Sequence, residues 1–294
     1  MINILADEGI DQFTILNLSS IENRINEFSD YLLERKKLGL QLDLEEAKLD
    51  SRLNAYLNGK AAKSIICIFL PYLSEHHCFE SNISVSAQSI DYHIWGKEKL
   101  KNIVEVLKRK YTNSFFEIQV DNGPLNERFF ALESGLGYKG LNNMIINSKY
   151  GSYGFIGLIV TDTLLEEKVF PKKSCFNCKK CIEVCPGNAL SEEGIFYGSR
   201  CASYITQKKG DLSEDEIRII KRSNKIYGCD ICQIICPHNI GVEIIKEEID
   251  VLKDIHLSDI KNLSNNEFKK KFRNRAFAWR GKKNLIRNLN IIKD

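Results

Sequence analysis

The chain has 294 residues, of which 43% are hydrophobic and 28% charged, with a formal net charge of +3, the composition of an ordinary globular protein. No apolar stretch approaches the roughly 18 residues that a membrane-spanning helix needs, and the N-terminal sequence MINILADEGI lacks the basic and then apolar pattern of a signal peptide. We therefore expect a cytoplasmic protein without membrane association, in which neighbouring cysteines bind metal or take part in catalysis rather than form disulfides.

The first half of the chain predicts alternating helices and strands. Residues 1–60 are predicted to be helical, because apolar residues recur at helical spacing from Ile21 to Leu33. The segment KSIICIFLPYL predicts a buried strand, residues 91–110 an amphipathic helix, and SFFEIQV a second strand. NERFFALESGLG predicts a further helix, and NNMIINSKYGSYGFIGLIVTD two short strands joined by a turn that contains glycine. This alternation favours an α/β or α+β domain.

The composition changes after residue 169 and again after residue 242. Cysteines are frequent between these two points, and a basic, helical sequence follows them. Residues 261–294 carry eleven Lys or Arg against two acidic residues, which indicates either a polyanion such as nucleic acid as partner or a solvated helix face. We therefore predict three parts, residues 1–169, 170–242 and 243–294.

The cysteine-rich part contains the run C-x2-C-x2-C-x3-C-P, formed by Cys175, Cys178, Cys181, Cys185 and Pro186. This is the spacing of bacterial ferredoxins, in which three thiolates hold one iron–sulfur cube and the fourth binds a second cube. The proline forces the residue before it out of helical geometry and ends the loop. A second cluster therefore needs three further thiols downstream.

Those thiols follow in a shortened repeat of the same run. The segment CDICQIICP supplies Cys229, Cys232 and Cys236, and Cys201 is the remaining cysteine nearby. The exchange of the fourth ligand predicts that the first [4Fe-4S] cluster is bound by Cys175, Cys178, Cys181 and Cys236, and the second by Cys185, Cys201, Cys229 and Cys232.

Zinc is the alternative occupant, because it also takes four thiolates, usually from paired C-x2-C knuckles. A triple run that ends in Cys-Pro and occurs twice is not a knuckle pattern, so we favour iron and sulfur. Cys67 lies far from this region in an apolar strand and is predicted to be a core residue, and Cys78 has no predicted role.

Asp121, in QVDNGPLNERFFA, is the best candidate for acid–base chemistry in residues 1–169. It follows an apolar strand and precedes a turn and a helix, and ligands often bind at such strand ends. A partly desolvated carboxylate there would have a raised pKa and could donate a proton near neutral pH. An Asx-turn or a helix N-cap is the structural alternative. No glycine-rich nucleotide-binding motif is present.

Several segments, in order along the chain, resemble motifs of the epoxyqueuosine reductases, which are cobalamin-dependent enzymes of tRNA modification. The matching segments are SIDYHIWGKEKL, VDNGPLNERFFALESGLGYKGLNNMIIN, YGSYGFIGLIVTD, RCASYIT, YGCDICQIICPHN and FRNRAFAWRGKKNLIRNL. The cysteine runs alone would suit many ferredoxin-like proteins, whereas their combination with the D-N-G-P block is more specific.

The resemblance implies a fold and a reaction. Residues 1–169 would bind base-off cobalamin and carry catalysis, residues 170–242 would form a ferredoxin-like double-cluster module, and residues 243–294 a short helical segment. Electrons from a ferredoxin or flavodoxin would pass through the clusters to cobalt, which attacks or reduces the epoxide of epoxyqueuosine at the tRNA wobble position, while Asp121 protonates the departing oxygen. The partner would be the tRNA anticodon region, and we expect a monomer. The residues implied to contact cobalamin are Ser84, Tyr92, His93, Asp121, Asn142, Ser152 and Ser203.

The sequence departs from the family pattern at three places. Leu141 stands where the family usually has lysine, with Lys139 two residues earlier, and Val85 stands where an arginine is typical. The family's helical-repeat extension is expected to be absent or shortened at Asp294. The basic tail is expected to present its charges to tRNA phosphates, including those of Arg275 and Arg287, while Phe272, Phe277 and Trp279 pack in the core. His238 is expected to be a core or surface histidine.

Two other functions remain compatible with the sequence. One is a plain electron-transfer protein whose first domain is not catalytic. The other is a different corrinoid reductase that acts on a small molecule.

Overall fold

The structure is a computed structural model that describes residues 2–37, 53–57, 60–121, 123–246 and 250–293. Its centre is a four-stranded sheet with the order β1-β4-β8-β5, in which every neighbouring pair is antiparallel. The strands are β1 (Phe13–Asn17), β4 (Ser64–Pro71), β5 (Phe116–Val120) and β8 (Gly154–Thr161).

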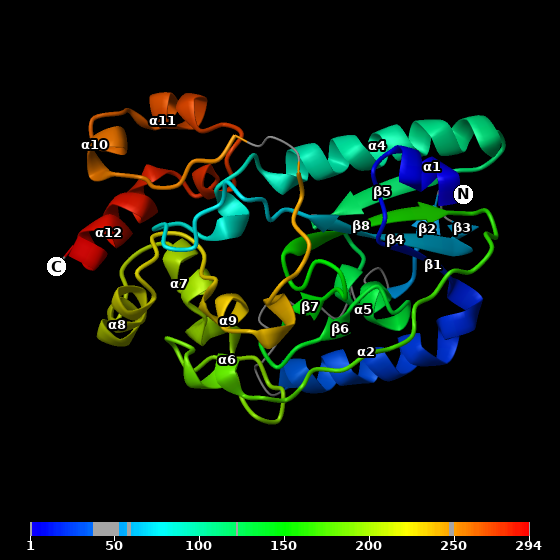
Figure 1. Cartoon of the computed structure of the whole chain (residues 1–294), viewed down its shortest axis with the longest axis horizontal. Helices are drawn as coiled ribbons and strands as arrows, with labels where there is room; N and C mark the ends of the chain where they lie inside the picture. The colour runs from blue at the N-terminus through cyan, green and yellow to red at the C-terminus, as the bar shows by residue number, and fades with distance from the viewer. Residues whose placement is uncertain (1, 38–52, 58–59, 122, 247–249, 294) are drawn as a thin grey trace.

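Helices cover both faces of this sheet (Figure 1). One face packs against α1 (Ile2–Asp7) and α4 (Tyr92–Lys110), and the other against α2 (Glu22–Lys37) and α5 (Glu127–Glu133). The alternation of side chains along β4 explains the two layers, because Ile66, Ile68 and Leu70 enter one core while Ile65, Cys67 and Phe69 enter the other. Two small ribbons complete this part, β2 (Tyr56–Leu57) with β3 (Lys60–Ala61) and β6 (Tyr138–Lys139) with β7 (Ile145–Ile146).

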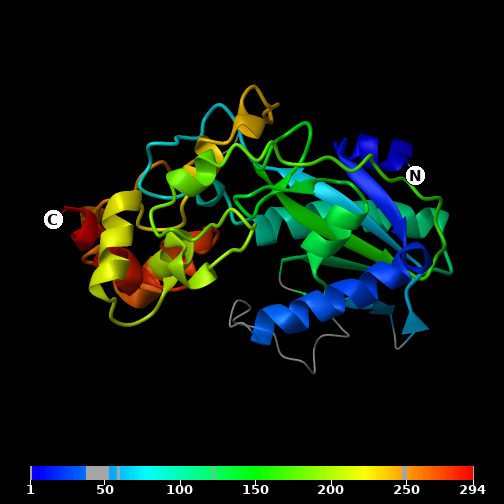
Figure 2. The same ribbon diagram turned by 90° about the horizontal axis from the view of Figure 1, so that it is seen from below.

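The cysteine-rich part is built of short helices at one end of the sheet, as both views show (Figures 1 and 2). They are α6 (Lys180–Glu183), α7 (Ala202–Gln207), α8 (Glu214–Ser223) and α9 (Ile231–Ile234). The chain ends with α10 (Leu257–Ile260), α11 (Asn265–Lys271) and α12 (Lys282–Lys293). Their apolar side chains, with Phe268 and Phe277 fully buried, form a third core together with Ile83 and Ile226. The C-terminal helices therefore hold the sheet domain and the cysteine-rich part together.

Several sequence-based expectations are corrected. The sheet is antiparallel, which selects α+β from the two predicted arrangements and excludes an α/β fold with parallel strands. Residues 1–60 are not uniformly helical, because Phe13–Asn17 form edge strand β1, and residues 38–52 lie outside the described part. Residues 145–161 do not form one hairpin, since β7 pairs with β6 while β8 is the long strand between β4 and β5.

The strands at KSIICIFLPYL and SFFEIQV and the helices at residues 91–110 and NERFFALE are confirmed. Cys67 is fully buried in the core, as predicted. Among the described residues, no helix has both the length and the apolar character that crossing a bilayer requires.

Candidate active site

A cavity of about 1130 Å³ opens between α2, α5 and the cysteine-rich part. Pockets for drug-sized ligands are usually about 300–1,000 Å³, so this one suits a large cofactor or an extruded nucleoside. Asp121 lies on its wall, and Tyr204, 48% exposed, enters it from the cysteine-rich part.

Asp121 follows the last residue of β5 and has φ of 58°, in the left-handed region that aspartate tolerates better than most residues. Its side chain is 56% exposed. It does not cap the following helix, because the N-cap of α5 is Asn126, whose side chain accepts the N–H of Phe129. The carboxylate of Asp121 is therefore free to serve the cavity.

Two aromatic side chains contact Oδ2 of Asp121. The hydroxyl of Tyr92 donates to it over 2.9 Å, and Nε2 of His93 lies 3.0 Å from it. Nδ1 of His93 lies 2.7 Å from Oδ1 of Asp91, which also caps α4 by accepting the N–H of His93. The Tyr92 ring stacks on Phe155 at 3.7 Å, so β8 fixes its position. Burial, followed by the charge of Asp121, raises the pKa of Tyr92, which keeps its hydroxyl a donor.

This geometry gives Asp121 a neighbour with which it can exchange a proton. His93 lies between two carboxylates, and a neutral imidazole has one N–H donor and one acceptor. If Nδ1–H of His93 donates to Asp91, then Nε2 can accept a hydrogen bond from a protonated Asp121. If both ring nitrogens of His93 are protonated, the ring donates to Asp91 and to Asp121. In both arrangements Nε2 of His93 keeps its hydrogen bond with Oδ2 of Asp121, so a proton can pass between these two atoms.

Glu127, next to Asp121, is a largely desolvated carboxyl group. Burial, with a smaller effect from the Asp121 charge, raises the pKa of Glu127 to about 7. Oε1 of Glu127 accepts the N–H of Asp121 over 2.6 Å and Nε2 of Gln119 over 3.1 Å. Glu127 therefore holds the backbone of Asp121 in its left-handed conformation.

Four cations line the cavity. Arg24 pairs with Glu133, and the other three lie near one another: Arg35, Arg128 and Lys139. None of these three has a carboxylate partner among the residues that the structure describes. Desolvation lowers the pKa of Lys139, and the charges of Arg128 and Arg35 lower it further. A site that crowds unpaired cations in this way favours an anionic group of the ligand, such as a phosphate.

The first four predicted cluster thiols share one small cavity, which Leu141, Asn142 and His238 also line. Burial raises the pKa of Cys181 to about 11, and the nearby thiols of Cys236, Cys175 and Cys178 act in the same direction. Cys178 is exposed, whereas Cys181 and Cys236 are buried. We call these four residues the outer set: Cys175, Cys178, Cys181 and Cys236.

The other four thiols also influence one another. Burial raises the pKa of Cys229 to about 12, with further contributions from Asp230, Cys201 and Cys185. Burial also raises the pKa of Cys232, and the charges of Cys229, Cys201 and Cys185 act in the same direction, as does that of Cys181 from the outer set. We call these four residues the inner set: Cys185, Cys201, Cys229 and Cys232.

The segment around Cys201 reaches the wall of the large cavity. Gly198 and Tyr204, which flank Cys201 in sequence, line that cavity. Gly228, with φ of +74°, precedes Cys229, and a Cβ atom there would lie 2.2 Å from Oγ of Ser84. The close approach of Ser84 to this backbone therefore requires glycine.

No disulfide joins any of the ten cysteines, all of which lie in the described part of the chain. In the described part of the chain, no three His, Cys, Asp or Glu side chains converge closely enough to hold a single metal ion. The eight thiols of the two sets are therefore available as metal ligands, four in each set.

The predicted cofactor residues do not all reach the large cavity. Tyr92, His93 and Asp121 come together, as described. Ser152 is fully buried, where its hydroxyl donates to Gln233 over 2.9 Å and accepts from Asn239. The remaining three lie beside the cysteines: Ser84 next to Gly228, Asn142 with its Nδ2 3.4 Å from the carbonyl of Cys232, and Ser203 within α7.

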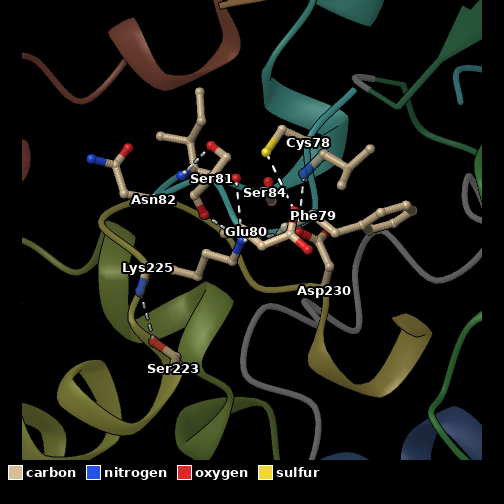
Figure 3. A network of polar contacts seen from close by, with 12 residues as sticks. Cys78, Phe79, Glu80, Ser81, Asn82, Ser84, Ser223, Lys225 and Asp230 are labelled. Atoms are coloured by element: carbon tan, nitrogen blue, oxygen red, sulfur yellow. Dashed lines mark hydrogen bonds and ion pairs between the residues drawn. The ribbon is translucent and has the colours of Figure 1, made fainter. Parts of the chain in front are cut away.

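A buried polar network ties the sheet domain to the inner set (Figure 3). Nζ of Lys225, 4% exposed, donates to the carbonyls of Phe79 and Ser81. It also lies 3.9 Å from Oδ2 of Asp230, which accepts the N–H of Val85 over 2.9 Å. Burial raises the pKa of Asp230 to about 6. This network fixes the loop that carries Ser84 against the segment that carries Cys229.

Comparison with known proteins decides the family. Residues 174–239 match the family described as "4Fe-4S double cluster binding domain", and residues 52–122 match "Epoxyqueuosine reductase QueG, DUF1730". The chain is 34% identical over 269 residues to the epoxyqueuosine reductase of Lactococcus garvieae. The match covers 88% of this chain and 76% of that protein. This chain belongs to the epoxyqueuosine reductase family.

Solved structures of epoxyqueuosine reductases match over almost the whole chain. One is the Bacillus subtilis enzyme with its aspartate catalytic loop swung out of the active site. It matches with a TM-score of 0.84 at 28% identity, and the match covers 99% of this chain and 80% of the Bacillus subtilis chain. An epoxyqueuosine reductase with an epoxyqueuosine-modified tRNA-Tyr stem loop has a TM-score of 0.82 at 28% identity and covers 99% and 79%. This epoxyqueuosine reductase contains a double [4Fe-4S] module over residues 174–239.

Sequence reasoning missed several site residues. Asp91 lies in the segment SIDYHIWGKEKL, and its place before an amphipathic helix could have indicated an N-cap. Arg35 and Arg128 carry no local signal, because only the packing of α2 beside α5 brings them into one cavity. His238 was expected to be unremarkable, but Nδ1 lies 2.8 Å from the hydroxyl of Tyr138 and the ring lies beside the outer set.

Proposed function

We propose that this protein reduces epoxyqueuosine to queuosine at the wobble position of tRNA, with cobalamin and two [4Fe-4S] clusters. The observation that carries the proposal is the placement of Asp121 in a large cavity whose wall also includes Gly198 and Tyr204, on either side of Cys201 in sequence. The reaction takes up two electrons and two protons, breaks both C–O bonds of the epoxide and releases water. Two one-electron clusters can hold the two electrons.

The residues of the cavity suit cobalamin. The volume of about 1130 Å³ exceeds that of usual ligand pockets. The apolar and aromatic side chains of Phe28, Leu32 and Phe129 offer a surface for the macrocycle, and the unpaired cations Arg35, Arg128 and Lys139 suit the phosphate of its nucleotide tail. When bound, cobalamin supplies a strongly reducing cobalt centre able to open the epoxide.

Asp121 is the proposed acid at the departing oxygen. Proton transfer by a positioned side chain contributes roughly 10²–10⁴-fold to a rate. His93, held by Asp91, returns the proton to Asp121, and Tyr92 fixes the orientation of the carboxylate. The resemblance to an enzyme solved with its aspartate catalytic loop swung out of the active site supports this role, because Asp121 lies in a loop after β5.

The eight module cysteines are the proposed ligands, the outer set for one cube and the inner set for the other. Thiols with raised pKa values lose their protons when iron binds, because the metal stabilises the thiolate. The inner cube would lie next to the cofactor and the outer cube near the surface. The proposed parts are a cobalamin-binding catalytic domain over residues 1–169, the double-cluster module over residues 170–242 and the basic helical segment over residues 243–294.

The tRNA would lie against the C-terminal segment, beside the active site. Arg280 stacks over the ring of exposed Trp279 at 3.6 Å, and Nε1 of Trp279 lies 3.2 Å from the hydroxyl of Tyr227. Burial raises the pKa of Tyr227 to about 12, and Asp91 and Asp121 are close enough to add to the shift. An indole fixed next to the reacting nucleoside can stack on an unpaired base of the anticodon loop.

Not every basic side chain of the segment is available for phosphates. Arg275 is 8% exposed and bonds Asp250 and the carbonyl of Gln88, and Nη1 of Arg287 donates to the carbonyls of Lys208 and Gly210. These two arginines are therefore structural, contrary to the expectation from sequence. Phe272 and Phe277 are buried as expected, whereas Trp279 is 59% exposed, so that expectation was wrong for Trp279.

The departures from the family pattern lie outside the wall of the large cavity. Leu141 lies beside the outer set, and Val85 is fully buried with its N–H bound to Asp230. Both positions are thus compatible with cobalamin in the large cavity.

The test is anaerobic reconstitution with iron, sulfide and cobalamin, followed by mass spectrometry of nucleosides from tRNA that carries epoxyqueuosine. The expected result is queuosine, two four-iron clusters per chain and a corrin spectrum. Loaded enzyme that yields no queuosine would overturn the proposal. Failure to bind tRNA with corrin bound would indicate a small-molecule reductase, and failure to take up corrin a plain electron carrier.

A further inference from the structure

The loop that carries the first outer cysteines is unusually exposed and basic. Between Pro171 and Cys181 every residue is exposed except Cys175 and Cys181. The segment PKKSCFNCKKC contains four lysines and no acidic residue. Asn177 and Lys179 have φ of 53° and 62°, so the loop keeps a backbone that few L-residues adopt, as expected where it must wrap around a bound group.

Phe176 projects from this loop and is 69% exposed. Its position is nevertheless fixed. The Phe176 ring stacks on the His238 ring at 3.8 Å, and the backbone N–H of Phe176 donates to Nε2 of His238 over 3.2 Å. Nδ1 of His238 in turn lies 2.8 Å from the hydroxyl of Tyr138. An exposed aromatic ring held in one position loses little entropy on binding, which is typical of the anchor residues of protein interfaces.

Two of the four lysines are free to attract a partner. Lys172 pairs with Glu133 over 2.9 Å, and Lys179 pairs with Glu192. Lys173 and Lys180 have no carboxylate partner within the part of the chain that the structure describes. A surface with unpaired positive charge around an apolar anchor fits a protein of negative charge, because complementary charges steer the encounter.

The same surface lies over the outer set. Cys178 is exposed and Cys175 half-buried, whereas none of the four inner thiols is exposed. Electron transfer between proteins requires the two redox centres to approach closely, so a carrier has to dock where a cluster is near the surface.

We propose that the surface formed by Lys173, Phe176, Cys178 and Lys180 is the docking site of an acidic protein electron carrier, and that electrons enter through the outer cluster. In each encounter the carrier loses one electron and the outer cluster is reduced from the 2+ to the 1+ state, without a proton. The inference rests on the proposed assignment of the outer set as cluster ligands, but it does not depend on the tRNA reaction.

The test measures the rate at which reduced flavodoxin, an acidic one-electron donor, bleaches the cluster absorbance of reconstituted protein under anaerobic stopped flow. Lys173→Glu/Lys180→Glu is expected to lower the second-order rate at least tenfold at low salt, and the difference from wild type should shrink as salt screens the charges. Phe176→Ser is expected to lower the rate at every salt concentration. The matched control Lys101→Glu/Lys110→Glu, with the same charge change on α4, should stay within twofold of wild type.

Photoreduced deazaflavin, a small reductant that needs no docking site, serves as the second readout. It should reduce the clusters of all four proteins at equal rates, and the iron content should be equal, which shows that the clusters are intact. Equal flavodoxin rates for Lys173→Glu/Lys180→Glu and wild type, or an equal loss in the α4 control, would overturn the proposal. Queuosine formation with chemical reductant is scored separately, so its failure would bear on the proposed function alone.

Discussion

Nε2 of His93 lies 3.0 Å from Oδ2 of Asp121, and this contact connects the proposed acid to a second proton carrier. The other ring nitrogen faces Asp91 at 2.7 Å, so the imidazole is held in one orientation. Without the ring, Asp121 would have to recover its proton from water after each turnover.

The change His93→Gln tests this relay. Glutamine keeps a donor near Asp121 but cannot pass a proton on, so we expect turnover to fall roughly 100-fold, with a changed pH–rate profile. The corrin spectrum and tRNA affinity should remain those of wild type. Turnover at the wild-type rate would rule the relay out.

Glu127 makes stability depend on pH. Folding raises its pKa from the ordinary 4.5 to about 7, so the folded protein binds this proton more tightly than the unfolded chain. The resulting contribution is fully present below pH 4.5 and is lost as the pH rises to about 7. It amounts to a few kcal/mol at most, since one pKa unit corresponds to about 1.4 kcal/mol.

Glu127→Gln should therefore remove this part of the pH dependence. Melting temperatures measured across the interval should fall less steeply for the variant than for wild type, while Oε1 of the glutamine still accepts the N–H of Asp121. Glu98→Gln, on an exposed part of α4, should behave like wild type. Parallel curves for wild type and Glu127→Gln would contradict the assignment.

Lys225 is the centre of the buried polar network between the sheet domain and the cysteine-rich part. Lys225→Met leaves Asp230 and the carbonyls of Phe79 and Ser81 without their cation, and loss of one buried partner costs roughly 3–5 kcal/mol. We expect the melting temperature of the reconstituted protein to fall by roughly 10 °C. Lys225→Met/Asp230→Asn should recover part of the loss, because no buried carboxylate remains. A shift of less than two degrees in the single variant would show that the network contributes little.

Trp279 should contribute to tRNA binding through stacking. Trp279→Ala is expected to weaken binding of the anticodon stem loop roughly 5- to 150-fold, as loss of one stacked base costs about 1–3 kcal/mol, while Trp279→Phe should retain most of the affinity. Phe115→Ala, at an aromatic residue that is 54% exposed elsewhere on the sheet domain, is the control. Fluorescence anisotropy at several salt concentrations separates this effect from that of the basic side chains. Equal affinity of Trp279→Ala and wild type would refute the stacking role.

The parts of the fold that the sequence could predict are those with a strong local pattern. The helix at 92–110 has an apolar stripe, and the strand at 64–71 is a continuous apolar run. Strand β1 was missed because its five residues FTILN lie between helices, and its pairing with β4 is a long-range contact. The antiparallel order of the sheet is also set by tertiary packing, and alternation of elements alone could not distinguish it from a parallel one.

Some residues of the site could likewise be predicted from the sequence, and others could not. The spacing of the cysteines indicates two groups of four, and Asp121 follows a predicted strand. By contrast, the cations Arg35 and Arg128 come together only because α2 packs beside α5. Nor could composition show that Arg275 turns inward to Asp250 while Trp279 remains exposed.

Conversion of epoxyqueuosine by Asp121→Asn under single-turnover conditions is the most direct test of the account. The variant is loaded anaerobically with iron, sulfide and cobalamin, reduced chemically and mixed with tRNA that carries epoxyqueuosine, and nucleosides are counted by mass spectrometry. We predict wild-type iron content and corrin spectrum with queuosine formation slowed at least 100-fold, because asparagine cannot donate a proton to the departing oxygen. Queuosine formed at the wild-type rate by the loaded variant would contradict the assignment of Asp121 and the mechanism built on it.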